Sequence, residues 1–238
     1  MPKPRKLYKY NLLKVFDDIL KTFKQPVKFT KIIRKFEELD LSHEAIIALL
    51  TEVNANDFTP LNSFIMNKNK LFLKLYMHIA PNYLENEKMT EMLTKPNKFG
   101  FNPLQQALKT GDLDIIRDLL LKLNENLSAS EIKHELLLKN FAGYNSLHQV
   151  CQNNSLEAVK IYIDFVKNTI GSDAPYILHT LAHDHANSGN TPKPRRSNRD
   201  YIFLLSLLNN LKKDPPVKSA TPDIEISDPI QLLPMGLL

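Results

Sequence analysis

The stretch Gly100–Leu123, GFNPLQQALKTGDLDIIRDLLLKL, has the pattern of two short helices separated by a glycine. Leu104 and Leu108 place apolar side chains on one face of the first helix. Gly111 interrupts that pattern, and apolar residues then recur at helical spacing from Leu113 to Leu120. If this helix pair recurs at a fixed period, the fold follows from the repetition.

The pattern does recur, at a period of 43 residues. The tetrapeptides TPLN, NPLQ and NSLH begin at Thr59, Asn102 and Asn145. Thirteen, fourteen and seventeen residues after each of these anchors the side chain is apolar or aromatic: Phe72, Leu73 and Tyr76, then Ile115, Ile116 and Leu119, then Ala158, Val159 and Tyr162. A fourth anchor, TPKP at Thr191, keeps the register with Leu204, Leu205 and Leu208. The chain is therefore predicted to be a helical repeat protein.

Each anchor carries residue types that begin a helix. Thr or Asn accepts a backbone N–H bond at a helix N-terminus, and Pro suits the first helical turn. Further helical segments follow at 42–53, 84–95, 128–139 and 172–184. Ser42, Ser128 and Ser172 are expected to be N-caps, with Glu131 as the capping-box partner of Ser128. Each repeat is therefore predicted to be a unit of three helices.

The units NKFGFNPLQQALKTGDLDIIRDLL and NFAGYNSLHQVCQNNSLEAVKIYI resemble the ankyrin repeat. Gly100 and Gly143 match the turn glycine of that family, Leu104 and Leu147 its buried leucine, and His148 its histidine. The resemblance covers roughly residues 54–212, although the 43-residue period exceeds the ~33 residues of the family because of the inserted helix. It implies an all-α, ankyrin-like helical repeat solenoid with an N-terminal helical cap.

The two ends of the chain depart from the repeat. Residues 1–41 are expected to form a basic N-terminal helical cap, residues 42–213 about four divergent ankyrin-like repeats, and residues 214–238 a flexible, Pro-rich tail. In the fourth unit TPKPRRSNRD, with two prolines and three arginines, indicates a loop where the first helix should be. The segment YIFLLSLLNNLKK after it has the pattern of a closing helix.

The composition excludes several classes of protein. A single cysteine, Cys151, allows no internal disulfide and fits a reducing compartment. With six glycines there is no Gly-rich loop to cradle a phosphate. No apolar run reaches the ~18–20 residues of a membrane-spanning helix, and the basic start lacks the apolar stretch of a secretory signal. We expect a cytoplasmic protein without a transmembrane segment.

One cluster has the residue types of a metal-dependent hydrolase. In HTLAHDH, His179 and His183 stand one helical turn apart, and Asp184 or His185 could complete a zinc site. The same cluster also fits a His-rich helix end, where cationic side chains are favourable. Cys151 fits a small buried position, and the repeat register gives His148 a structural role. We therefore expect no catalytic residue, no metal and no cofactor, with the hydrolase kept as an alternative.

The better candidate is a surface for binding another protein. In ankyrin-like stacks, the resemblance implies that the turn tips and first helices line a concave face where partners dock. Phe58, Phe101 and Tyr144 precede the three anchors and are expected to form an aromatic ladder on that face. The remaining candidate partner-binding residues lie in the same turns or at the ends of the first helices: Met66, Lys98, Phe99, Lys109, Phe141 and Gln152.

The sequence thus predicts a monomeric, non-catalytic module that binds another protein. The Asn- and Lys-rich composition and the hydrophobic end IQLLPMGLL also resemble ankyrin effectors that intracellular bacteria deliver into host cells, which implies the host cytosol or nucleus. The alternative partner is a nucleic acid or anionic surface bound by the basic N-terminus, PKPRK, and by KPRRSNR. The same runs fit the solvated face of a cap, so a nucleic-acid partner is not expected.

Overall fold

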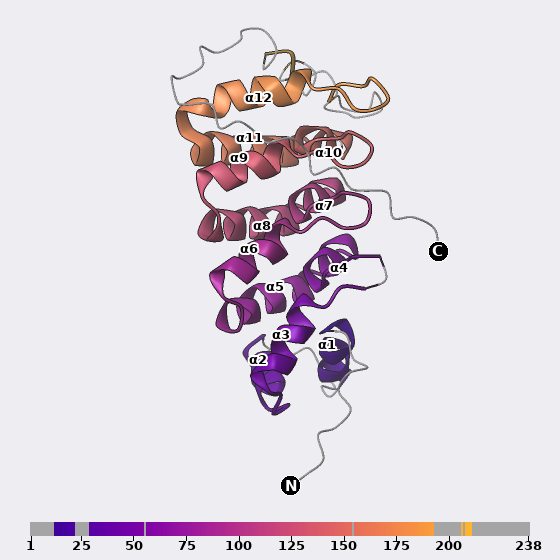
Figure 1. The fold of residues 1–238 in the computed structure, drawn as a ribbon, viewed down its shortest axis with the longest axis vertical. Helices are drawn as coiled ribbons and strands as arrows, with labels where there is room; N and C mark the ends of the chain where they lie inside the picture. The colour runs from indigo at the N-terminus through magenta and orange to yellow at the C-terminus, as the bar shows by residue number, and fades with distance from the viewer. Residues whose placement is uncertain are drawn as a thin grey trace, which may run out of the picture.

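The computed structural model describes residues 12–21, 29–54, 56–153, 155–192, 206 and 208–210. Within these ranges every regular element is a helix, and the helices form one elongated stack with α1 at one end and α12 at the other (Figure 1). The all-α repeat architecture predicted from the 43-residue period is confirmed. The predicted tail, 214–238, lies outside the described residues, as do 1–11 and 22–28 of the cap.

Each unit contributes one helix to each of three columns. The first helices are α4 (Pro60–Met66), α7 (Pro103–Thr110) and α10 (Ser146–Gln152). The second helices are α5 (Lys70–Ile79), α8 (Leu113–Asn126) and α11 (Leu156–Ile170). The inserted helices are α3 (His43–Thr51), α6 (Asn86–Thr94), α9 (Ala129–Leu137) and α12 (Ala174–His183), and two 3-10 turns, η1 (Ala80–Asn82) and η2 (Gly171–Asp173), follow α5 and α11.

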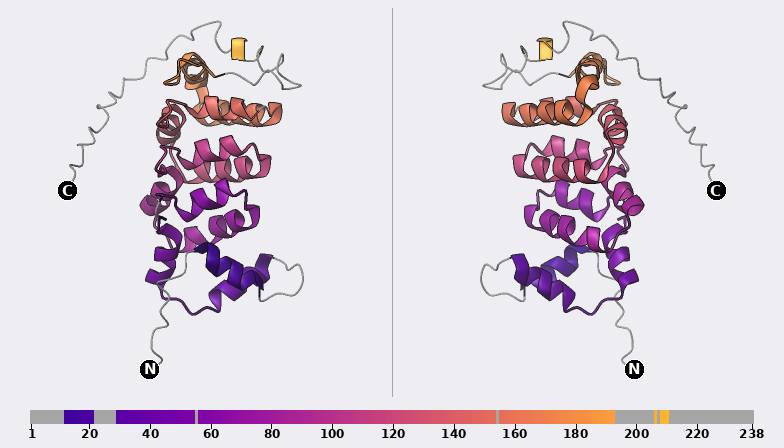
Figure 2. Two further views of the ribbon diagram at one scale, coloured as in Figure 1. Left: turned by 90° about the vertical axis from the view of Figure 1, so that its right-hand side faces the viewer. Right: turned by 90° about the vertical axis from the view of Figure 1, so that its left-hand side faces the viewer.

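Like helices pack on like helices along the stack. α7 contacts both α4 and α10, and α8 contacts both α5 and α11. The inserted helices form a separate column along one side, which Figure 2 shows beside the layers of first and second helices. Because each unit buries its apolar face on its neighbours, the core is continuous from α1 to α12. The shape of the surface is therefore set by the whole stack.

The second helices supply the largest buried side chains. The nine apolar register positions predicted from the sequence, from Phe72 to Tyr162, are all at most 2% exposed. The hydroxyl of Tyr76 donates to the carbonyl of Leu50 (3.1 Å), and that of Tyr162 lies 2.7 Å from Ser146 Oγ. Burial raises the pKa of both hydroxyls. Each fully buried side chain of this size contributes about 1.5–3 kcal/mol to folding.

The N-terminal helices α1 (Leu12–Lys21) and α2 (Phe29–Glu37) cover the first repeat. The ring of Phe16 is fully buried, with centroids 5.8 Å from Phe36, 5.9 Å from Phe64 and 5.2 Å from Phe72. Aromatic contacts at such distances add to the area that the rings bury. The described part of the predicted cap thus closes the apolar end of the stack.

The anchors begin the first helices as predicted. Thr59, Asn102 and Asn145 are N-caps, and their side chains accept from the third backbone N–H of α4, α7 and α10 at 3.1, 2.7 and 3.0 Å. Ser42 and Ser128 cap α3 and α9, and Glu131 completes the capping box of α9. Each such cap is worth about 1 kcal/mol.

The prediction that Ser172 caps the last inserted helix is wrong. Gly171, at a φ of 64°, turns the chain into η2, and Asp173 precedes α12 with helical dihedral angles and no side-chain cap bond. An N-cap side chain needs an extended backbone to reach the first turn, and the 3-10 turn removes it. Beyond the anchor Thr191–Pro192, the loop and most of the closing helix predicted for the fourth unit lie outside the described residues, although Leu208 is buried.

Candidate binding surface

The turns that lead into the first helices share one construction, built on an asparagine. The backbone N–H of Asn97 donates to the carbonyl of Phe101 (2.9 Å), while its Oδ1 accepts from the N–H groups of Phe99 (2.9 Å) and Phe101 (3.2 Å). Asn54 and Asn140 make equivalent bonds in the first and third units. Each tip is therefore fixed by three hydrogen bonds to one residue.

Neighbouring turns are also bonded to one another. The N–H of Lys98 donates to the carbonyl of Asn56 (3.3 Å), and that of Phe141 donates to the carbonyl of Phe99 (3.2 Å). The close approach explains Gly100, whose φ is 76°: a Cβ there would lie 2.9 Å from the backbone nitrogen of Phe141. The turn tips thus form a rigid row along one edge of the stack (Figure 1).

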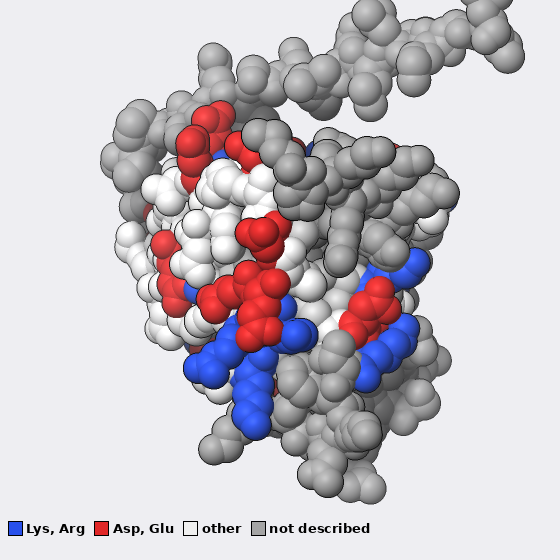
Figure 3. Space-filling view, turned by 90° about the horizontal axis from the view of Figure 1, so that it is seen from below, with Lys and Arg blue, Asp and Glu red and all other residues white. Residues whose placement is uncertain are grey.

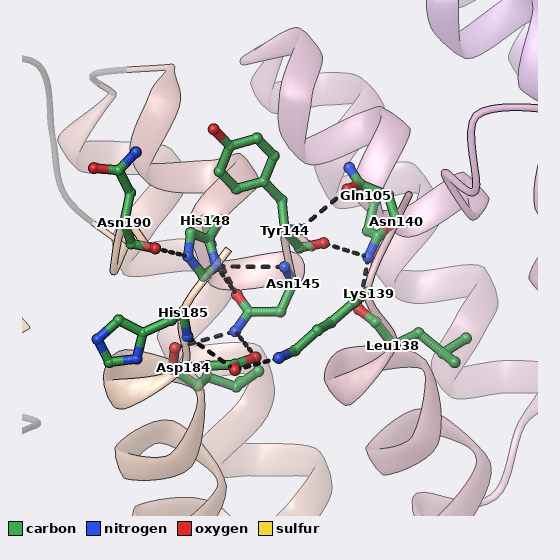
Figure 4. A network of polar contacts seen from close by, with 11 residues as sticks. Gln105, Leu138, Lys139, Asn140, Tyr144, Asn145, His148, Asp184, His185 and Asn190 are labelled. Atoms are coloured by element: carbon green, nitrogen blue, oxygen red, sulfur yellow. Dashed lines mark hydrogen bonds and ion pairs between the residues drawn. The ribbon is translucent and has the colours of Figure 1, made fainter. Parts of the chain in front are cut away.

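Polar side chains behind the turns tie each unit to the next (Figure 4). Gln105 Nε2 donates to the carbonyls of Leu138 (2.8 Å) and Tyr144 (3.3 Å). His148 is buried, which lowers its pKa, and its Nε2 lies 3.0 Å from the carbonyl oxygen of Asn190 in the next turn. The structural role predicted for His148 is therefore confirmed.

Asp184 belongs to the same network. It accepts from Asn145 Nδ2 (3.1 Å) and forms an ion pair with Lys139. Asn145 Nδ2 also donates to the carbonyl of Leu181 (3.1 Å), so the end of α12 is held against the start of α10. Because these groups are occupied by the repeat itself, they support the row of turns rather than face a ligand.

An open groove of about 610 Å³ lies beside the turns. It is lined by residues of the three turns, of α4 and the loop that follows it, and of α7. Three of its apolar side chains are well exposed: Met66 by 45%, Phe99 by 50% and Phe141 by 71%. The other lining residues are Phe58, Lys68, Phe101, Gln106, Lys109, Thr110 and Ala142. We call this feature the turn groove.

The turn groove gathers six of the nine residues predicted to bind a partner: Phe58, Met66, Phe99, Phe101, Lys109 and Phe141. Lys98 lies beside it, with Nζ 5.1 Å from the centroid of Phe99. Tyr144 and Gln152 do not line it. The ring of Tyr144 lies instead against His148, 5.2 Å between centroids.

The prediction that Phe58, Phe101 and Tyr144 form an exposed ladder is wrong, because Phe58 is buried and Phe101 and Tyr144 are half-buried. Phe58 is only 6% exposed and meets the edge of Phe99, 6.3 Å between centroids. The residue before each anchor pairs through its backbone with the asparagine that starts the turn. The rings of Phe101 and Tyr144 contact Lys109 and His148 of their own first helices. The exposed aromatic rings are therefore those of Phe99 and Phe141 at the turn tips.

Three lysines surround the turn groove, and none of the residues lining it is acidic. Lys109 Nζ lies 4.4 Å from the centroid of Phe101, and Lys98 Nζ donates to Asn56 Oδ1. Lys68 was not among the sequence-predicted residues, although its register offered a signal. It occupies the position that Gly111 holds in the next unit, with a φ of 53° that non-glycine residues rarely adopt.

The histidine cluster does not gather into a metal site. The rings of His179 and His183 lie 4.1 Å apart, and His183 Nδ1 contacts the carbonyl of His179 (3.0 Å). The exposed His185 lies nearby, and its N–H contacts Asp184. Across the described ranges, no group of three or more His, Cys, Asp or Glu side chains is placed to hold one ion. Cys151 is buried, as predicted.

The described part of the N-terminal end is mixed in charge. Figure 3, which views the stack from that end, shows Lys and Arg side chains beside Asp and Glu. Lys21 pairs with Asp18 (3.2 Å), and Lys35 pairs with Glu38 (3.0 Å). The most basic stretch predicted there, PKPRK, falls in residues that the structure does not describe. No helix of the described residues is long and apolar enough to cross a membrane.

Comparisons with known sequences do not identify a family for this chain. No family model matches the chain, and no curated protein matches it. The crystal structure of EF0377, an ankyrin repeat protein, is similar over 85% of this chain and 94% of that chain, at 18% identity and a TM-score of 0.37. The repeated turn and helix pair follow the order of elements expected from the ankyrin resemblance, and the bonds between neighbouring turns join the units into one helical repeat stack.

Proposed function

We propose that this protein is a non-catalytic recognition module that binds another protein in the turn groove. The observation that carries the proposal is the placement of two exposed phenylalanines, Phe99 and Phe141, on hydrogen-bonded turns. Large exposed apolar side chains that lie together are a solubility liability unless a partner covers them. Aromatic anchors on a rigid support lose little conformational entropy on binding, which favours affinity.

The experiment compares three forms of the full chain as bait in cell lysate. In the first variant, Phe99→Ser and Phe141→Ser remove both exposed rings. The control, Leu121→Ser, removes a side chain that is 58% exposed on α8, which is not among the elements lining the turn groove. A partner bound by the parent and by the control, but lost in the double variant, supports the proposal.

If the variant with Phe99→Ser and Phe141→Ser retained every partner, the proposal that partners bind in the turn groove would be contradicted. Circular dichroism and thermal melting of all three forms check that the fold is unchanged, which is expected because the substituted side chains are exposed.

The proposal extends to where the protein acts. The buried Cys151 is compatible with a reducing cytoplasm. The compositional resemblance to bacterial ankyrin effectors supports the cytosol or nucleus of a host cell as the site of action. A translocation reporter fused to the chain tests this in infected cells. Signal in the host cytosol that requires the secretion machinery supports an effector role, and signal confined to the bacterium contradicts it.

A further inference from the structure

We infer that the partner segment recognised by the turn groove is an acidic peptide carrying a large apolar side chain. This inference rests on the proposed function and adds the chemistry of the partner. The apolar half of the requirement follows from the exposed surfaces of Met66, Phe99 and Phe141, which need an apolar side chain between them to exclude water.

The acidic half follows from the charge around the same surface. Lys68 and Lys109 line the turn groove and Lys98 borders it, whereas no acidic side chain lines it. Within the described ranges none of these three lysines forms an ion pair. The one acidic residue in the adjoining turn, Asp57, is exposed and is not part of the lining. A carboxylate in the groove would therefore meet the positive charge of Lys68 and Lys109, with that of Lys98 beside the groove.

The backbone of Lys68 points the same way. Its φ of 53° is a conformation that glycine adopts without strain, and the equivalent position of the second unit is Gly111, at 67°. A lysine there carries a conformational cost with no compensating contact among the charged groups of the described chain. The positive charge that Lys68 adds to the lining of the turn groove is the feature that glycine could not supply.

Aromatic rings with lysines also suit single-stranded nucleic acid, whose bases stack on open ring faces. The geometry disfavours that occupant. Lys109 Nζ lies over the ring of Phe101 at 4.4 Å, and Lys98 Nζ lies over that of Phe99 at 5.1 Å, so cations already cover a face of each ring. The groove offers apolar edges and ammonium groups, which match a peptide better than a row of bases.

The test selects displayed random peptides on three forms of the full chain: the parent, Lys68→Glu with Lys109→Glu, and Phe99→Ser with Phe141→Ser. The parent should enrich peptides that combine Asp or Glu with Phe, Trp or Leu. The charge-reversed chain should lose these peptides by at least about tenfold in affinity and enrich basic ones instead, because like charges repel across an interface. The milder Lys68→Gln with Lys109→Gln should weaken the same peptides.

A matched control carries the same charge change away from the turn groove. Lys74→Glu with Lys167→Glu alters two exposed lysines on α5 and α11 and should leave the affinity of the selected peptides within about twofold of the parent. An equal loss in this control would overturn the inference, since it would assign the effect to net charge alone.

The remaining outcomes separate this inference from the proposed function. Enrichment of neutral or basic peptides that still require Phe99 and Phe141 would overturn the acidic partner and leave the recognition module standing. Binding of oligouridylate, lost on charge reversal and tighter than that of any selected peptide, would overturn the peptide in favour of nucleic acid. If no peptide depends on Phe99 and Phe141, the proposed function itself fails.

Discussion

Glu135 makes the stability of this protein depend on pH in an unusual direction. Its side chain is only 5% exposed on α9, where Oε2 accepts from Asn102 Nδ2 (2.7 Å). Burial raises the pKa of this carboxyl from an ordinary 4.5 to about 7, and the bond from Asn102 offsets only part of the rise. The protonated form is therefore preferred in the folded chain. The contribution of Glu135 to the unfolding free energy is therefore fully present below pH 4.5 and is lost as the pH rises through 7.

The size of the effect follows from the pKa values. A difference of 4.5 to about 7 corresponds to about 3 kcal/mol of unfolding free energy, lost by the time Glu135 is fully ionised. Glu135→Gln removes the titration and keeps an acceptor for Asn102. We expect urea unfolding to give similar free energies for parent and variant near pH 5, with the variant more stable by up to about 3 kcal/mol near pH 8.5.

The comparison between the two chains isolates Glu135, because other groups such as His148 titrate in both. Glu131→Gln is the control on the same helix: its exposed carboxylate accepts from Ser128, which lowers its pKa. Its difference from the parent should be constant between about pH 5.5 and pH 8.5. A difference for Glu135→Gln that is equally flat over this range would refute the reasoning.

Two further predictions concern the stack itself, both measured by urea unfolding. Gly143→Ala should cost more than about 1 kcal/mol, because φ is 77° and the new Cβ would lie 2.6 Å from the backbone nitrogen of Asn187; an unchanged midpoint would show that the turns do not pack this closely. Leu119→Ala should cost about 2–5 kcal/mol by opening a cavity between α8 and its neighbours, and a loss below 1 kcal/mol would contradict its placement in the core.

The repeat could be predicted from the sequence because it depends on interactions between residues that are close together in the chain. Caps such as Asn102 act on backbone groups three residues away, and apolar side chains at helical spacing define the buried face of one helix. The failure at Ser172 has the same origin. Ser172 could cap a helix only if the chain before it were extended, but Gly171 begins a 3-10 turn there. The residue type alone does not indicate this backbone geometry.

The binding surface could be predicted only in part, since exposure depends on the neighbouring unit. Phe58 and Phe99 are both turn aromatics in the sequence, yet Phe58 is buried and Phe99 is half exposed. The register aligns Lys68 with Gly111, which is a signal in the sequence, but only the coordinates show that Lys68 adopts the same positive φ. The asparagines that build the turns, Asn54, Asn97 and Asn140, also recur every 43 residues, so the sequence did contain a signal for them.

The central claim is that partners meet the turn groove, and site-specific photo-cross-linking tests it most directly. A benzophenone side chain replaces Phe99 in one form of the full chain and Leu121 in another. Both residues are exposed, and Leu121 does not line the turn groove. Illumination in cells should give a covalent adduct from position 99, competed by excess unlabelled chain, and none from position 121. Adducts from position 121 alone, or equally from both positions, would contradict the account.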